Sequence, residues 1–217
     1  MTLLVVDDIE VRYGNIRALK GVSFEVAEGE IVALLGANGA GKTTTQKTVS
    51  GMLRPSLGGI IYDGQRIDGI PAHDLIRLGI CHVPEGRHVF PRMTVAENLE
   101  MGAFRFKSVD QSDLDHVLEL FPRLRERYKQ QAGTLSGGEQ QRTAIARALV
   151  HQPGILIADE PTGNLDPKLA DEIMDLLERV CAQGTTVFVA THDHDLVRER
   201  KKRTLQINDG MISETFL

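Results

Sequence analysis

A glycine-rich segment that ends in a lysine and a threonine is the first place where this sequence could do chemistry. Residues 36–43 read Gly-Ala-Asn-Gly-Ala-Gly-Lys-Thr and follow the apolar run Ile31–Leu35. Glycines let neighbouring backbone N–H groups turn towards one anion, and the N-terminus of a following helix adds partial positive charge. A strand, this spacing and a helix predict a phosphate-binding P-loop. The alternative is a glycine-rich turn with an incidental lysine.

The loop and the start of the next helix are expected to hold the phosphates of ATP. Lys42 would bridge the β- and γ-phosphates, and the Thr43 hydroxyl would hold Mg²⁺. The predicted cofactors are therefore ATP and Mg²⁺. The nucleotide-binding residues expected in this segment are Gly36, Asn38, Gly39, Ala40, Gly41, Lys42, Thr43 and Thr44.

Two adjacent carboxylates end a second apolar run much later in the chain, where Asp159 and Glu160 follow Ile155–Ala158. Asp159 suits a Mg²⁺ role through water, because hard Mg²⁺ keeps much of its hydration. Glu160 stands where a carboxylate at a strand end would polarise the attacking water, help that is typically worth about 10²–10⁴-fold. The pair predicts a metal residue and a catalytic residue for hydrolysis. The alternative is two solvated carboxylates in a loop.

A buried sheet has to position these residues. The run Ile31–Leu35 is continuously apolar, as in a strand buried on both faces, and short strands with glycine-containing turns before it suggest an antiparallel layer. Alternation of helices and strands further on implies a parallel sheet. The expected strands are residues 2–12, 22–26, 30–35, 59–62, 65–67, 155–159 and 185–190, and the expected helices are residues 42–51, 95–103, 113–121, 139–151 and 168–181.

Strand-like runs are missing between about residues 87 and 153, where helical spacing dominates. We therefore expect one domain over residues 1–217, with a core of residues 1–86 and 154–217 and a helical subdomain of residues 87–153. The expected fold class is α/β, a P-loop NTPase fold with a mostly parallel core sheet, an N-terminal antiparallel β layer and a helical insert.

Composition and charge limit the kinds of partner that we expect for this chain. A formal net charge of −5 argues against nucleic acid, whose binders usually show a basic face. Cys81 and Cys181 give no disulfide framework, so buried reduced thiols in the cytosol are expected. No stretch approaches the roughly 18–20 apolar residues that cross a bilayer, so another chain would supply any membrane span. The basic run 198–203 is expected to be a solvated helix end, or alternatively a contact with anionic lipid headgroups.

With these motifs in place, the sequence resembles the ATP-binding subunits of ATP-binding cassette (ABC) transporters over essentially its whole length. The resemblance implies that Tyr13 stacks on adenine, although a packed strand aromatic is the alternative. It implies that His192 is the switch histidine, a catalytic residue that senses the γ-phosphate. Glu85, placed among the nucleotide-binding residues, stands where most members carry a glutamine. This departure puts the usual water and Mg²⁺ role of that loop in doubt.

The resemblance also implies that Ser136, Gly137 and Gly138 form the signature loop, and that Asp166, in the run Asn164–Asp166, joins the sites of two subunits. Ser136 with Glu139 fits a capping box, which leaves the N–H groups of the two glycines open to a phosphate. Because this loop lies in the separate helical unit, we expect it to face the ATP of a partner. Hydrolysis would then require two ABC subunits, as a homodimer or a heterodimer. The alternative is a plain helix start.

Two branches of the family are represented in one chain. Residues 1–134 resemble the ATPase of branched-chain amino acid importers, and residues 142–217 resemble the cell-division and lipoprotein-release ATPases. Residues 135–141 are common to both, so we hypothesise a mosaic, either a natural recombinant or a laboratory chimera. The alternative is a divergent natural member of one branch. The runs that carry the likeness are Leu34–Thr45 and Val83–Leu99 for the importers, and Ile157–Asp166 and Ala190–Asp193 for the other branch.

The resemblance implies a cytoplasmic protein, peripheral on the inner face of the cell membrane, that dimerises around two ATP molecules. It would power an integral membrane permease, and the importer-like part indicates amino-acid import. One alternative is an ATPase that transmits a signal through a cell-division membrane protein. Another is an engineered chimera that hydrolyses ATP without a native transport partner. Nucleic acid is not an expected partner, since the family members that act on DNA or ribosomes carry a long coiled coil or two cassettes, and this sequence shows neither.

Overall fold

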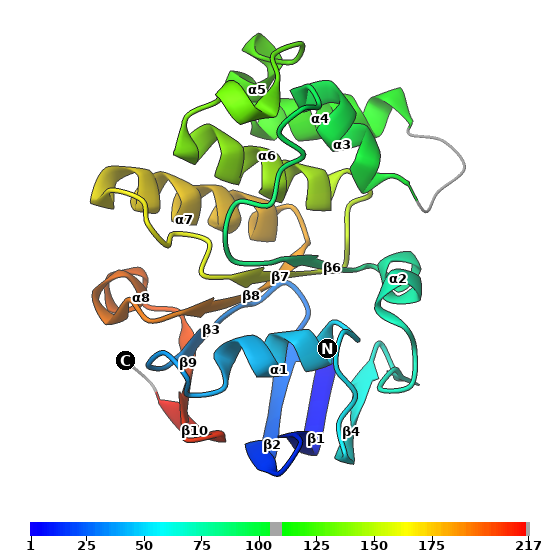
Figure 1. Ribbon diagram of the computed structural model, residues 1–217, viewed down its shortest axis with the longest axis vertical. Coiled ribbons are helices and arrows are strands. Elements are labelled where there is room, and N and C mark those ends of the chain that lie inside the picture. Colours follow the sequence, from blue (N-terminus) through cyan, green and yellow to red (C-terminus); the bar gives the residue numbers. More distant parts are fainter. Residues whose placement is uncertain (105–109, 216–217) are drawn as a thin grey trace.

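Two β-sheets and several helices make up the structure, a computed structural model that describes residues 1–104 and 110–215 (Figure 1). Five neighbouring strands of the larger sheet run parallel, and only the edge strand β10 is antiparallel to its neighbour. In spatial order this sheet contains β10 (Met211–Thr215), β9 (Arg203–Asn208), β3 (Ile31–Leu35), β8 (Thr186–Thr191), β7 (Ile155–Asp159) and β6 (Ile80–Val83). The prediction of a mostly parallel core sheet is confirmed.

The central strands of the parallel sheet are buried on both faces. Every residue of β3, β7 and β8 is buried. Along β7, Ile155 and Ile157 pack into the apolar core on the side of the smaller sheet, whereas Leu156 and Ala158 pack into the core under the helices. This alternation is the pleat of a strand with apolar layers on both sides.

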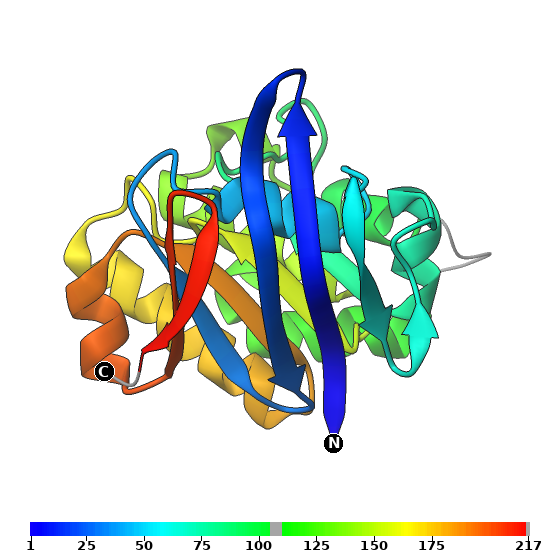
Figure 2. The same ribbon diagram turned by 90° about the horizontal axis from the view of Figure 1, so that it is seen from below.

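The smaller, antiparallel sheet lies across the parallel strands when the molecule is seen from below (Figure 2). In spatial order it contains β2 (Ile16–Ala27), β1 (Thr2–Tyr13), β4 (Leu57–Tyr62) and β5 (Gln65–Arg66). The predicted antiparallel layer is confirmed, although β2 begins well before the expected residue 22. The prediction relied on a glycine-containing turn before residue 22, but the strand continues through Gly21, which lies at a register shift in the pairing with β1. The short strand β6 and the C-terminal strands β9 and β10 were not predicted.

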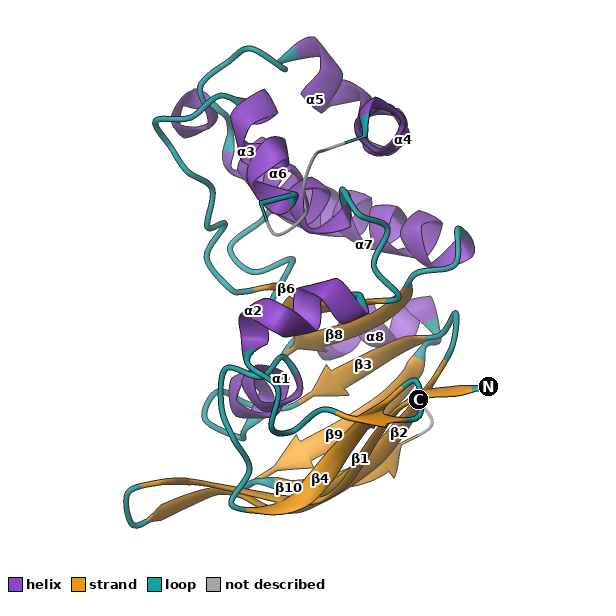
Figure 3. Cartoon of the chain, turned by 90° about the vertical axis from the view of Figure 1, so that its right-hand side faces the viewer, coloured by secondary structure: helices purple, strands orange, loops and turns teal. Residues whose placement is uncertain are grey.

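Helix α1 (Lys42–Val49) lies between the two sheets and contacts β7 and β8 on one side and β2 on the other (Figure 3). The buried amide of Gln46 donates a hydrogen bond of 3.0 Å to the carbonyl oxygen of Ala158 in β7. This bond fixes the helix against the strand whose end carries the two carboxylates.

Helices cover the other face of the parallel sheet (Figure 3). Those between β6 and β7 are α3 (Val95–Gly102), α4 (Gln111–Leu120), α5 (Pro122–Glu126) and α6 (Gly137–Leu149). Next to the sheet lie α7 (Pro167–Ala182) and α8 (His194–Arg200), and the remaining short elements are α2 (Ala72–Leu75), η1 (Ile76–Leu78) and η2 (Ala132–Thr134). The predicted helices are present, with α6 starting earlier than residue 139. The subdomain boundaries stay a prediction.

Residues of the basic run 198–203 form ion pairs with α7. The Arg200 guanidinium contacts the Asp171 carboxylate at 2.9 Å and also pairs with Asp175, and Lys202 Nζ lies 3.0 Å from Glu178. These contacts favour a structural role for those charges over a contact with lipid. No helix among residues 1–104 and 110–215 is both long and apolar enough to cross a membrane. Cys81 and Cys181 are free thiols, each partly buried.

His82 in β6 should make the stability of the fold sensitive to acid. Burial, with a smaller contribution from the Lys47 charge, lowers the pKa of His82 from 6.5 to about 4. The unfolded chain therefore takes up this proton at a higher pH than the folded chain, so the free energy of unfolding falls as the pH drops from 6.5 towards 4. His82→Asn removes this contribution. Urea unfolding at several pH values measures this difference. Between pH 6.5 and 4, the free energy of unfolding of the variant should fall by on the order of 3 kcal/mol less than that of the parent.

His194→Asn, which removes an exposed histidine, is the matched control for this comparison. Parallel pH profiles for the parent and His82→Asn would contradict the prediction.

Candidate functional site

The loops that follow β3, β7 and β8 leave the parallel sheet at the same edge. Leu35 at the end of β3 pairs with Thr191 at the end of β8, and Asp159 at the end of β7 pairs with Ala190. This register brings the three loops together around a cavity of about 620 Å³. Its lining residues are Ala18, Ala37, Asn38, Gly39, Gly41, Lys42, Thr43, Thr44, Glu85, Glu160, Gly163, Asn164 and His192. Most of the residues predicted from the motifs therefore meet in one place.

The centre of the cavity holds a chain of charged and polar groups. Lys42 Nζ donates to the Gly36 carbonyl oxygen at 2.7 Å and lies 3.2 Å from Glu160 Oε1. The other carboxylate oxygen of Glu160 is 2.9 Å from Nδ1 of His192. The side chains of Lys42 and Glu160 are only 6% and 8% exposed, so this ion pair is shielded from water. The predicted phosphate lysine, hydrolytic carboxylate and switch histidine are thus directly connected.

The loop before α1 needs glycine at two of the predicted positions. Gly41 has a φ of 116°, and a Cβ there would also lie 3.0 Å from side-chain carbons of Leu19 and Ile207. A Cβ on Gly36 would lie 2.5 Å from the carbonyl oxygen of Ile207. Helix α1 begins at Lys42 without a side-chain cap. Its first N–H groups therefore stay available to an anion in the cavity.

Asp159 and Thr43 form a pair that fits Mg²⁺. The Thr43 hydroxyl hydrogen-bonds to the Asp159 carboxylate, which is only 2% exposed, and the Oδ1 atom of Asp159 is buried without a hydrogen-bond partner. Burial raises the pKa of Asp159, and the hydrogen bond from Thr43 opposes this rise. An unpaired carboxylate oxygen beside a hydroxyl is a donor set that a hard divalent cation prefers.

The remaining predicted residues lie outside the cavity lining. Ser136 caps α6, accepts from the Glu139 N–H at 3.4 Å and donates its own N–H to the Glu139 carboxylate at 2.9 Å, so the capping box is present. Asp166 caps α7 through the Leu169 N–H at 3.1 Å. Tyr13 ends β1 and is 48% exposed. The adenine role of Tyr13 and the partner-facing role of the residues at these caps stay predictions.

Some residues that line the cavity were not among those predicted to bind nucleotide. Ala18 belongs to β2, and only the packing of the antiparallel sheet against the P-loop brings it there. Gly163 and Asn164 follow Glu160 closely, so their position beside the carboxylates could have been inferred. Ala40, predicted to bind nucleotide, is buried next to Gly36 instead of lining the cavity.

Residues 19–163 match the family model described as ABC transporter. The chain belongs to this family. It is an ABC-type ATPase, an ATP-hydrolysing subunit of the transport class, and members of the family bind ATP and generally use Mg²⁺. The P-loop NTPase fold predicted from the sequence is confirmed.

Two curated relatives and one solved structure illustrate the similarity. The chain is 45% identical to the high-affinity branched-chain amino acid transport ATP-binding protein BraG of Pseudomonas aeruginosa, over 97% of the chain and 91% of BraG. It is 36% identical to the cell division ATP-binding protein FtsE of Bacillus subtilis, over 97% of the chain and 94% of FtsE. A dimeric ATP-binding cassette in a post-hydrolysis state, bound to ADP and Pi, superimposes with a TM-score of 0.86 at 29% identity, covering 99% of each chain.

Similarity to both predicted branches is therefore confirmed for the chain as a whole. Both relatives align over nearly its full length, so these matches do not separate residues 1–134 from residues 142–217. The mosaic stays a hypothesis.

The buried ion pair between Lys42 and Glu160 should be visible in the stability of the nucleotide-free protein. Lys42→Met leaves the Glu160 charge buried without its cation, which should cost about 3 kcal/mol of unfolding free energy. Adding Glu160→Gln removes that charge and should restore most of the loss. Urea unfolding of the parent, both single variants and the double variant measures the coupling.

Lys20 provides a matched control, because in its ion pair with Asp209 the carboxylate is exposed and the lysine is only partly buried. Lys20→Met should cost less than about 1 kcal/mol. A double variant no more stable than Lys42→Met would show that the two charges do not compensate each other.

Proposed function

We propose that this chain is the ATPase subunit of a membrane importer for amino acids, and that two subunits close around two ATP molecules. The proposal rests on one observation: the predicted site residues of one chain lie in two separate places. The cavity gathers Lys42, Glu160 and His192, whereas the predicted signature residues Ser136, Gly137 and Gly138 do not line it. A second subunit, identical or different, would supply its own signature residues to this cavity.

The N-terminus of α6 is suited to such a role. Its side-chain cap satisfies the N–H of Glu139 and leaves those of Gly137 and Gly138, at the start of the helix, for an outside acceptor. A phosphate oxygen fits this position because of the helix dipole. The dimeric relative bound to ADP and Pi supports two-chain closure.

ATP binding would reorganise the charged chain at the centre of the cavity. Lys42 would exchange Glu160 and the Gly36 carbonyl for phosphate oxygens, and Glu160 would then be free to orient the attacking water. His192, already 2.9 Å from Glu160, would hold that carboxylate in place and read the γ-phosphate. Thr43 and Asp159 would hold Mg²⁺, which supplies positive charge to the phosphates.

The membrane partners are proposed from the relatives. The printed name of BraG refers to branched-chain amino acid transport, which supports an amino-acid permease as partner and a cytoplasmic location on the inner face of the membrane. The similarity to FtsE supports a second candidate, an ATPase that transmits a signal through a cell-division membrane protein. An engineered chimera would keep the ATPase activity without a native transport partner.

Glu160→Gln should separate binding from hydrolysis. The amide cannot act as a base and no longer competes for Lys42, so ATP affinity should be kept or raised while turnover falls by at least about 100-fold. The variant should form an ATP-dependent dimer, measured by light scattering after size exclusion, with calorimetry for ATP binding and phosphate release for turnover. Glu119→Gln, an exposed glutamate on α4, is the control. Normal turnover by Glu160→Gln would remove Glu160 from its proposed role.

The membrane partner can be identified with the ATP-locked Glu160→Gln protein as bait on detergent-solubilised membranes of the source organism. We expect an amino-acid permease to be retained in the presence of ATP and lost when the bait is Lys42→Ala, which lacks the phosphate lysine. Retention of a cell-division membrane protein would support the second candidate instead. Failure to retain any membrane protein would contradict both transport and signalling.

A further inference from the structure

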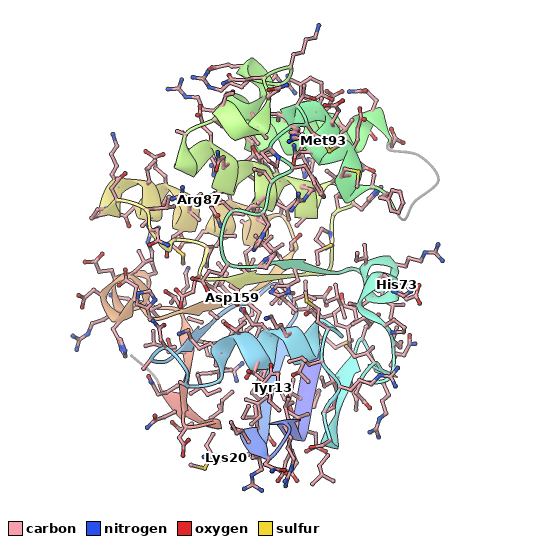
Figure 4. All side chains as sticks on the ribbon, viewed as in Figure 1. Tyr13, Lys20, His73, Arg87, Met93 and Asp159 are labelled. Atoms are coloured by element: carbon pink, nitrogen blue, oxygen red, sulfur yellow. The ribbon has the colours of Figure 1, made fainter. Side chains whose placement is uncertain are left out.

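The segment between β6 and α3 starts at the cavity and ends among the helices. Glu85 lines the cavity, and two residues later Arg87 lines a smaller adjoining cavity of about 280 Å³ that shares Glu85, Glu160 and Asn164 with it. Figure 4 shows Arg87 on the segment that rises from the sheet towards the helices, above Asp159. Arg87 therefore lies at the border between the proposed nucleotide site and the helical layer.

The Arg87 side chain contacts two loops that are far away in sequence. Its Nη2 atom donates to the carbonyl oxygen of Asn164 at 3.0 Å. Its guanidinium also lies directly over Gly137, where a Cβ would come within 2.5 Å of Nη1 and 2.7 Å of Cζ. One planar group thus touches the first residue of α6 and the loop that leads to α7.

The backbone of Arg87 is held in an uncommon conformation. Its φ is 62°, in the left-handed region, which costs a non-glycine residue roughly 1–2 kcal/mol. Such a conformation persists where surrounding contacts determine it. The preceding Gly86 also has a positive φ, of 101°.

The residues after Arg87 are fixed to the helical layer. Arg147 of α6 donates to the His88 carbonyl at 2.7 Å and lies over the Phe90 ring at 5.1 Å. The buried amide of Asn98 in α3 accepts from the Phe90 N–H at 2.8 Å and donates to the Phe90 carbonyl at 3.1 Å. The segment that follows Arg87 is therefore anchored to both α6 and α3.

We propose that Arg87 is a positioning residue that ties the Glu85 loop, the start of α6 and the Asn164 loop into one unit. The loop beside the chain's own nucleotide would then set the orientation of the surface that caps the nucleotide of the partner. This inference rests on the proposed function. A cation without the planar fork of arginine cannot lie over Gly137 and bond to Asn164 in the same way.

The test uses Arg87→Ala and Arg87→Lys in the Glu160→Gln background. Arg87 does not line the cavity of the P-loop, so ATP affinity of the monomer, measured by calorimetry below the dimerisation range, should stay within about two-fold. The dissociation constant of the ATP-bound dimer should rise by about ten-fold or more for Arg87→Ala, since a charge-assisted hydrogen bond is lost. In the Arg87→Ala variant that keeps the native Glu160, kcat should fall relative to the parent, whereas KM for ATP should change little.

Arg87→Lys keeps the charge and should remain clearly weaker in dimerisation than the parent. Arg92→Ala, an exposed arginine of the same segment, should match the parent and controls for loss of one cation. Circular dichroism and thermal unfolding check that each variant is folded, and Arg87→Gln replaces Arg87→Ala if that variant is not. If the Glu160→Gln parent fails to dimerise with ATP, the proposed function fails. If the parent dimerises and folded Arg87→Ala dimerises equally well, or Arg87→Lys restores dimerisation fully, the positioning role is wrong.

Discussion

A buried ion pair at the edge of the parallel sheet is the constraint on which the site depends. Removing Lys42 and Glu160 from water is costly unless each charge is compensated, and the 3.2 Å contact between them supplies that compensation. The contact exists only because β3 and β7 end at the same edge, with the buried strand β8 between them. The Gln46 bond to β7 fixes α1 in the same frame. The sheet thus determines the electrostatics of the cavity before any nucleotide arrives.

The same arrangement separates the cavity from the residues of the predicted signature loop at the start of α6. The loops at the end of the sheet carry the residues predicted to contact phosphate, metal and water, but α6 begins in the helical layer, with the Arg87 segment between its start and the cavity. An unpaired Asp159 oxygen and uncapped N–H groups at α1 leave binding capacity that this chain does not satisfy by itself. These groups are available to the nucleotide and metal ion that the site is predicted to bind.

How much could be predicted from the sequence depends on how local each signal is. The P-loop, Asp159, Glu160 and the Ser136 cap are set by spacing within a few residues of a strand or helix end, and the structure has the expected local geometry there. The sheet order and the strands β6 and β9 depend on long-range pairing, which no short motif encodes. Ala18 reaches the cavity only through packing between distant segments, and Arg87 meets Gly137 and Asn164 in the same way. Their spatial role could not be deduced from neighbouring residues.

The topology also limits what kind of mosaic could fold. From one edge of the parallel sheet to the other, β10 and β9 come from the later part of the chain, β3 from the earlier part, β8 and β7 from the later part, and β6 from the earlier part. Each boundary between the parts is therefore a strand pairing with buried side chains on both faces. Two parents could be joined only if they shared strand register and core volume, because a slip of one residue would turn apolar side chains to the wrong face. A join within residues 135–141, which lie outside both sheets, interrupts none of these strands. Members of one family satisfy these conditions. Whether such a mosaic folds therefore depends on how the strands of its two parts pair in the sheet, and not on the position of the join.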